Sequence, residues 1–148
     1  MSRKTARIAA MQMIYEQLSG GDGGEESLAV AYETLREEQD LSVNKNDPTV
    51  ADRAYVQKLL GGVLEHLDEI DEAIAKQSRN WSPDRMPKVD LTIMRMAVWE
   101  LLYEEDVPGS VVINEAVEIA KRFCDDGADR FINGVLGTIL REKEAAQQ

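Results

Sequence analysis

Three basic side chains at the start of the chain have the type and spacing to bind phosphate groups. Arg7 follows Arg3 by four residues and Lys4 by three, and such spacings share one face of a helix. No acidic residue precedes Glu16. Cations in a first helical turn oppose the macrodipole by about 0.3–1 kcal/mol each at low salt. Because residues that break a local rule are candidates for function, this group is either a nucleic-acid contact or a solvated helix end.

A second basic group lies near the other end of the chain. Lys121, Arg122 and Arg130 flank the acidic turn at 125–127, and Phe131 follows directly. An arginine beside an aromatic ring is a frequent means of stacking unpaired RNA bases. A phenylalanine at helical spacing more often belongs to the core, so core packing is the stronger interpretation of Phe131.

No catalytic or cofactor-binding motif accompanies these groups. The single histidine, His66, lies among acidic residues without a nucleophile at catalytic spacing, and Gly20–Gly24 lacks the Gly-Lys-Ser/Thr ending of a phosphate loop. One cysteine, Cys124, forms no internal disulfide and no Cys/His zinc cluster. We therefore expect no enzyme activity, no cofactor and no metal, although an active site assembled only by the fold would leave no such motif.

The composition is that of one soluble globular domain, with 148 residues of which 43% are hydrophobic and 30% charged. No apolar run approaches the ~20 residues that cross a bilayer, and no signal peptide is evident. With one cysteine, the expected compartment is the reducing cytoplasm. The net charge of −11 repels RNA at long range, so RNA binding requires a local basic patch.

Apolar residues recur with a helical period along nearly the whole chain, and no stretch alternates like a half-buried strand. This pattern predicts an all-α fold of roughly seven helices. The central helix is expected to be the one after Asp90, because its apolar residues cover much of its circumference. The expected helices cover about 2–18, 25–38, 47–66, 68–80, 91–105, 110–125 and 128–143.

Several residues are expected to serve the fold itself. Asp90 and Ser110 are plausible N-caps of the helices that follow them. Gly61-Gly62 and Gly134 fall within helices, where a glycine costs about 1 kcal/mol relative to alanine unless something packs against it. We expect close helix packing at these glycines. Arg95 lies in a mostly buried helix, which favours a structural ion pair or a carbonyl contact over a functional role.

Four blocks of the sequence, covering nearly all of it, resemble the NusB family. The blocks are Arg3-Lys4-x-Ala6-Arg7 with Gln12 and Ile14-Tyr15; Ile93–Ala97 with Glu100-Leu101; Val107-Pro108, Val111, Ile113–Glu118, Ala120-Lys121 and Phe123; and Phe131–Leu136. A related domain precedes RNA cytosine methyltransferases. Because the chain ends at Gln148 without room for a cofactor-binding domain, the resemblance favours the free-standing factor.

The resemblance implies one RNA-binding domain, 1–148, built of helical subdomains at about 1–66 and 67–145. It also implies a function in transcription antitermination. Members of the family bind the single-stranded boxA element of ribosomal RNA leaders jointly with NusE, a protein of the small ribosomal subunit. With other Nus factors, they make the RNA polymerase elongation complex resistant to termination.

The resemblance further implies which residues make the contacts. RNA contacts fall on Arg3, Lys4, Arg7 and the region of Arg130 and Phe131, beside which Lys121 is a further candidate from its own position. The partner surface falls on four residues: Tyr15, Gln77, Asp84 and Asp90.

Two positions depart from the family pattern. Gln77 stands where an aromatic partner contact can occur, and Gly127 stands where a polar residue often precedes the last helix. A helical adaptor that binds only proteins, with an acidic surface and incidental N-terminal cations, is the alternative function. The central expectation stays that of an RNA-binding and NusE-binding factor.

Overall fold

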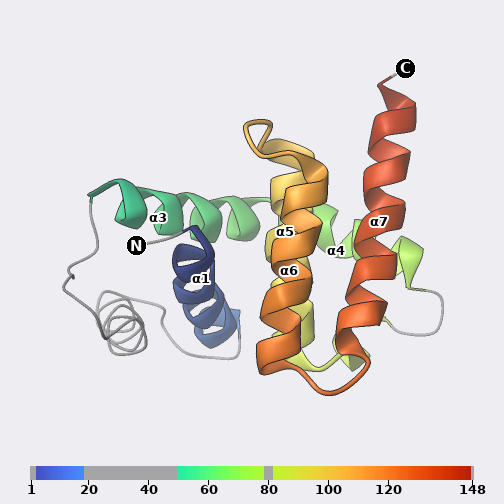
Figure 1. Cartoon of the computed structure of the whole chain (residues 1–148), viewed down its shortest axis with the longest axis horizontal. Helices are drawn as coiled ribbons and strands as arrows, with labels where there is room; N and C mark the ends of the chain where they lie inside the picture. Colours follow the sequence, from blue (N-terminus) through green and yellow to red (C-terminus); the bar gives the residue numbers. More distant parts are fainter. Residues whose placement is uncertain (1–2, 19–49, 79–81, 148) are drawn as a thin grey trace. The chain divides into compact units, whose positions relative to one another are not determined.

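The computed structural model describes residues 3–18, 50–78 and 82–147, and throughout these ranges it contains helices and turns and no strand (Figure 1). The expected all-α fold is confirmed, whereas the expected helix at 25–38 lies outside the described residues. No helix in the described ranges has the length and apolar character to cross a membrane. The helices are α1 (Arg3–Leu18), α3 (Val50–Glu65), α4 (Leu67–Gln77), α5 (Lys88–Tyr103), α6 (Gly109–Phe123) and α7 (Ala128–Ala146), with the 3₁₀ turn η1 (Pro83–Arg85).

The chain forms two compact units, Met1–Gly61 and Gly62–Gln148, and the division falls inside α3. In the first unit, α1 is buried along most of its length. The guanidinium of Arg7 on α1 lies 6.0 Å from the ring centroid of Tyr55 on α3, so these two helices meet near their N-terminal ends. The buried apolar residues of this unit are Ala6, Ile8, Ala9, Ala10, Met11, Met13, Ile14, Tyr55, Val56, Leu59 and Leu60.

The second unit is organised around α5, which packs against α4, α6 and α7. Helices α6 and α7 also pack against each other and are joined by a short turn at the lower edge of Figure 1. Most residues of α5 are buried, as its apolar circumference predicted. The neighbouring helices contribute single stripes, such as Ile70 and Ile74 from α4 and Ile132, Leu136 and Ile139 from α7.

The expected N-caps of α5 and α6 are wrong. Helix α5 begins at Lys88 after Pro87, and α6 begins at Gly109 after Pro108. Both prolines hold a φ near their preferred value, −54° and −59°, with extended ψ, and no side chain caps either helix. Asp90 is therefore inside the first turn of α5, where its negative charge complements the helix macrodipole.

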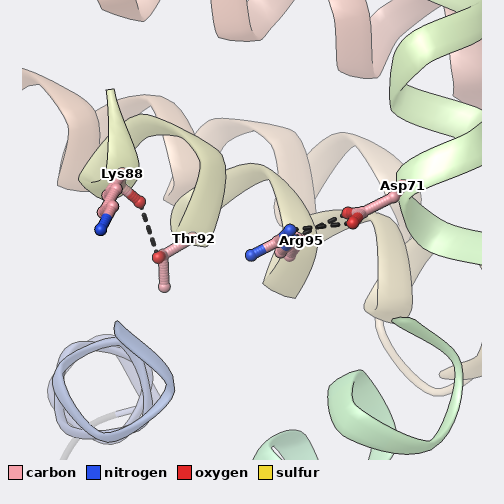
Figure 2. A network of polar contacts seen from close by, with 4 residues as sticks. All are labelled: Asp71, Lys88, Thr92 and Arg95. Atoms are coloured by element: carbon pink, nitrogen blue, oxygen red, sulfur yellow. Dashed lines mark hydrogen bonds and ion pairs between the residues drawn. The ribbon is translucent and has the colours of Figure 1, made fainter. Parts of the chain in front are cut away.

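An ion pair confirms the structural role expected for Arg95 (Figure 2). Nε and Nη2 of Arg95 on α5 donate to Oδ1 and Oδ2 of Asp71 on α4, each at 2.8 Å. The arginine side chain is 14% exposed and the aspartate 28%, so water screens the pair only in part. Earlier on α5, the Thr92 hydroxyl donates to the Lys88 carbonyl at 2.7 Å.

Close packing occurs at only one of the three helix glycines for which it was expected. A Cβ at Gly62 would lie 2.3 Å from Trp99 Nε1, so the indole occupies the space of the missing side chain. At Gly61 and Gly134 an added Cβ would meet no heavy atom within 4 Å, and the expectation is wrong there because both residues face open space. Gly127 precedes α7 at φ +93°, a conformation that explains glycine in this position.

Candidate nucleic-acid and partner interface

The N-terminal basic group divides between solvent and interior. Lys4 is exposed, whereas Arg7 is only 5% exposed. The apolar stripe through Ala10 and Met11 includes Arg7, and the ring of Tyr55 lies beneath its guanidinium. A guanidinium over an aromatic face gains roughly 0.5–2 kcal/mol, more as it is desolvated. Lys4 therefore presents a solvent-facing cation, and Arg7 holds an enclosed charge one turn further along. Arg3 lies in the same first turn of α1.

The second basic group surrounds the turn between α6 and α7. Lys121 and Arg130 are exposed. Phe131 is half-buried, so its ring lies partly in the core and is partly accessible to solvent. Lys121 Nζ lies 3.3 Å from Glu118 Oε2 one turn earlier. An exposed pair of this kind contributes little, about 0.2–1 kcal/mol, and leaves the lysine able to exchange partners.

Backbone hydrogen bonds fix this turn. The Cys124 amide donates to the Ala120 carbonyl at 2.9 Å and closes α6, and the Phe131 amide donates to the Gly127 carbonyl at 3.2 Å in the first turn of α7. The four-residue connection therefore places the last turn of α6 and the first turn of α7 at one end of the second unit (Figure 1). Lys121 and Arg122 also complement the negative end of the α6 macrodipole.

An exposed aromatic ring beside an arginine lies at this end, and the spacing of the sequence did not predict it. Phe123, the last residue of α6, is 36% exposed, and the Arg122 guanidinium lies 5.0 Å from its ring centroid. Helical spacing from Ile119 and Ala120 indicates an inward position for Phe123. The ring is exposed because α6 ends there, so the missing signal was the position of the helix end.

The four expected partner residues are placed in both units. Tyr15 is exposed on α1 in the first unit. In the second unit, Gln77 ends α4, Asp84 lies in η1, and Asp90 is half-buried in the first turn of α5. Gln77 also lines a pocket of about 480 Å³ between α4, α5 and α7.

Asp90 contacts the basic turn through Cys124. Burial and a hydrogen bond with the Asp90 carboxylate raise the pKa of the Cys124 thiol to about 12, and Asp125 adds to the effect. The thiol is thus protonated at neutral pH and donates to Asp90. This contact brings an expected partner residue on α5 next to the turn that carries Lys121, Arg130 and Phe131.

His66, between α3 and α4, stacks on the ring of Tyr103 with a centroid distance of 4.1 Å. Tyr103 donates a hydrogen bond to Glu69, which raises the tyrosine pKa to about 12 and lowers the pKa of the glutamate. Within the described ranges, no cluster of His, Cys, Asp and Glu has the arrangement of a metal site. The stacking of His66 on Tyr103 and the hydrogen bond from Tyr103 to Glu69 therefore connect the end of α5 to the start of α4.

Comparisons with known proteins agree along the whole chain. Residues 4–141 match the model of the NusB family. The chain is 40% identical over 144 residues to the transcription antitermination protein NusB of Bacillus subtilis strain 168, covering 97% of this chain and 98% of the relative.

Two solved structures have the same fold. The structure of T. maritima NusB is 28% identical, with a TM-score of 0.78, and covers 100% of this chain and 99% of its own. A chain from the crystal structure of the antitermination factors NusB and NusE in complex with double-stranded RNA is 28% identical, with a TM-score of 0.70. That match covers 95% of this chain and 96% of the other.

Proposed function

The chain belongs to the NusB family, and from this premise we propose that it acts in transcription antitermination by binding boxA RNA of ribosomal RNA leaders jointly with NusE. The observation that carries the proposal is the likeness to a chain of the NusB–NusE–RNA complex over 95% of the sequence. The proposed assembly includes the RNA polymerase elongation complex and other Nus factors, in the cytoplasm. The chain contributes binding alone to this process.

The proposed RNA contacts use the two basic groups differently. Lys4 is exposed, and no acidic residue precedes Glu16 on its helix, so it is suited to direct contact with a phosphate. Arg3, in the same turn of α1, is a further proposed RNA contact. Arg7 adds an enclosed positive charge to the same helix end. At the α6–α7 turn, Lys121 and Arg130 offer exposed cations and Phe131 a half-buried ring.

The net charge explains why a partner is part of the proposal. At −11 the long-range field of the chain opposes RNA approach, and local cations act only within about a Debye length, ~8–10 Å at physiological salt. NusE, as a ribosomal protein, is expected to be basic. The proposed NusE contacts are Gln77, Asp84 and Asp90 in the second unit and Tyr15 in the first. A basic partner there offsets the repulsion and extends the RNA-binding surface.

A gel-shift titration tests this function. We expect single-stranded boxA RNA to bind more tightly than a scrambled strand of equal length, and the complex with NusE to bind it more tightly than either protein alone. A boxA duplex is a necessary competitor, because the solved NusB–NusE complex contains double-stranded RNA. The acidic charge also favours a second function, a protein-binding adaptor. The adaptor is identified if the chain binds NusE but binds RNA without sequence preference, both in the absence and in the presence of NusE.

A further inference from the structure

The ring of Phe123 is exposed at the end of α6. At 36% exposure it is one of four exposed large apolar residues in the described ranges, with Tyr15, Tyr103 and Val111. The Arg122 guanidinium lies 5.0 Å from the Phe123 ring centroid. An aromatic ring with an adjacent guanidinium offers two flat π surfaces at the same place, and both accept the face of a nucleobase.

The backbone that carries this pair is held at two points. Directly after Phe123, the Cys124 amide donates to the Ala120 carbonyl at 2.9 Å, and the Ala128 amide donates to the Asp125 carbonyl at 3.1 Å. Backbone hydrogen bonds therefore hold the turn at its beginning and at its end. A surface that is already fixed loses little conformational entropy when a ligand binds it.

Local charge at this end favours base contacts over phosphate contacts. Three basic residues, Lys121, Arg122 and Arg130, are matched in number by three acidic ones in the same segment, Asp125, Asp126 and Asp129. Such a balanced surface releases few counterions on binding a polyanion. What it offers an RNA strand is the flat surface of a ring and a guanidinium, which favours a base as the occupant.

We propose that Phe123 and Arg122 form a platform on which one unpaired base of the bound RNA stacks. This inference rests on the proposed RNA-binding function and adds to it a contact with a base that involves no phosphate. In the proposed complex, Lys4 on α1 contacts the sugar–phosphate backbone, and the end of α6 contacts a base. Stacking of this type depends on the π surface and tolerates any ring of sufficient size.

Two substitutions separate the π surface from apolar bulk. Phe123→Leu keeps an apolar side chain without a ring, and Phe123→Trp keeps a ring. Alanine replacement of a stacking residue weakens binding by about 1–3 kcal/mol per base, or roughly 5- to 150-fold. We expect a loss in this range for Phe123→Leu and near-normal binding for Phe123→Trp. Tyr103→Leu is the matched control, because Tyr103 is 37% exposed and lies at the opposite end of α5 from Asp90.

The decisive readout combines these variants with RNA that lacks single bases. In single-stranded boxA RNA, each nucleotide in turn is made abasic, and affinity is measured for the wild-type chain and for Phe123→Leu. At one position the two losses should be non-additive, because the base and the ring contribute to the same contact. The salt dependence of binding should be unchanged by Phe123→Leu, since no phosphate contact is removed.

Each outcome decides the proposal. Wild-type affinity in Phe123→Leu, or additive losses at every abasic position, overturns the platform while the proposed function stands. Weaker binding of NusE by Phe123→Leu with unchanged RNA binding assigns the ring to the protein partner and also overturns it. Absence of boxA binding by the wild-type chain, with and without NusE, overturns the proposed function as well. A melting temperature like the wild type's for Phe123→Leu excludes misfolding as the cause of a loss.

Discussion

Gly62→Ala should destabilise the protein, whereas the same change at the adjacent Gly61 should stabilise it. Both glycines lie in α3, and alanine in a helix interior is favoured over glycine by about 1 kcal/mol. At Gly61 the added methyl group meets open space, so this gain should be realised. Only at Gly62 does the methyl group enter occupied volume.

The magnitude at Gly62 follows from the position of Trp99. The added Cβ would lie 2.3 Å from two atoms of the indole and 2.7 Å from a third, so the ring has to move by roughly 1 Å to reach ordinary contact. Trp99 is 6% exposed, which leaves little room for such a shift. Overpacking in a core costs typically ~1–3 kcal/mol. After the helix-propensity gain is subtracted, we expect Gly62→Ala to lose about 0–2 kcal/mol and to lie about 1–3 kcal/mol below Gly61→Ala.

Urea unfolding monitored by circular dichroism and by tryptophan fluorescence measures this difference. Gly134→Ala in α7 is a second control, because its Cβ also meets open space and should add stability. The fluorescence of the folded state should change in Gly62→Ala only, since the indole itself is displaced. Equal stabilisation by Gly61→Ala and Gly62→Ala would refute the packing argument.

Three further expectations concern polar groups. Arg95→Met, which leaves the carboxylate on α4 unpaired, should cost about 1–3 kcal/mol in the same unfolding assay; an unchanged midpoint contradicts a structural ion pair. Cys124, with a pKa of about 12, should be alkylated slowly at pH 8, because almost no thiolate is present there. Asp90→Asn should speed the alkylation by lowering that pKa. Equal alkylation rates in the variant and the wild type would show that Asp90 does not affect the thiol. Lys4→Ala should make the slope of log affinity for single-stranded RNA against log salt shallower by about 0.7, and Lys76→Ala, an exposed lysine of α4 paired with a glutamate, should not; equal slopes exclude a phosphate contact at Lys4.

Helix periods predicted the architecture well because burial in this fold follows the spacing of apolar residues. The circumference of α5 indicated a central helix, and the structure surrounds it with α4, α6 and α7. The starts of α5 and α6 were misplaced because Asp90 and Ser110 are good capping residues. They follow the prolines that precede the two helices by three and two positions. Backbone preference decided these ends, and no side-chain cap was needed.

Contacts between distant segments were beyond the reach of sequence patterns. Gly61 and Gly62 are identical neighbours, and only the position of Trp99, far along the chain, distinguishes them. The hydrogen bond between Cys124 and Asp90 likewise depends on how α5 meets the α6–α7 turn. For the candidate site, charge and spacing in the sequence were enough to single out Lys4, Lys121 and Arg130 as candidate RNA contacts. The enclosure of Arg7 and the exposure of Phe123 required the packed helices.

The most direct test of the proposed function is the coupling free energy between RNA and NusE. Four equilibria form the cycle: boxA RNA with the chain alone and with the chain bound to NusE, and NusE with the chain alone and with the chain bound to RNA. If the two ligands share a composite surface, each should strengthen the binding of the other by the same factor, about 5- to 150-fold or ~1–3 kcal/mol. A coupling near zero, with both ligands bound independently, would contradict the joint RNA and NusE surface proposed for this chain.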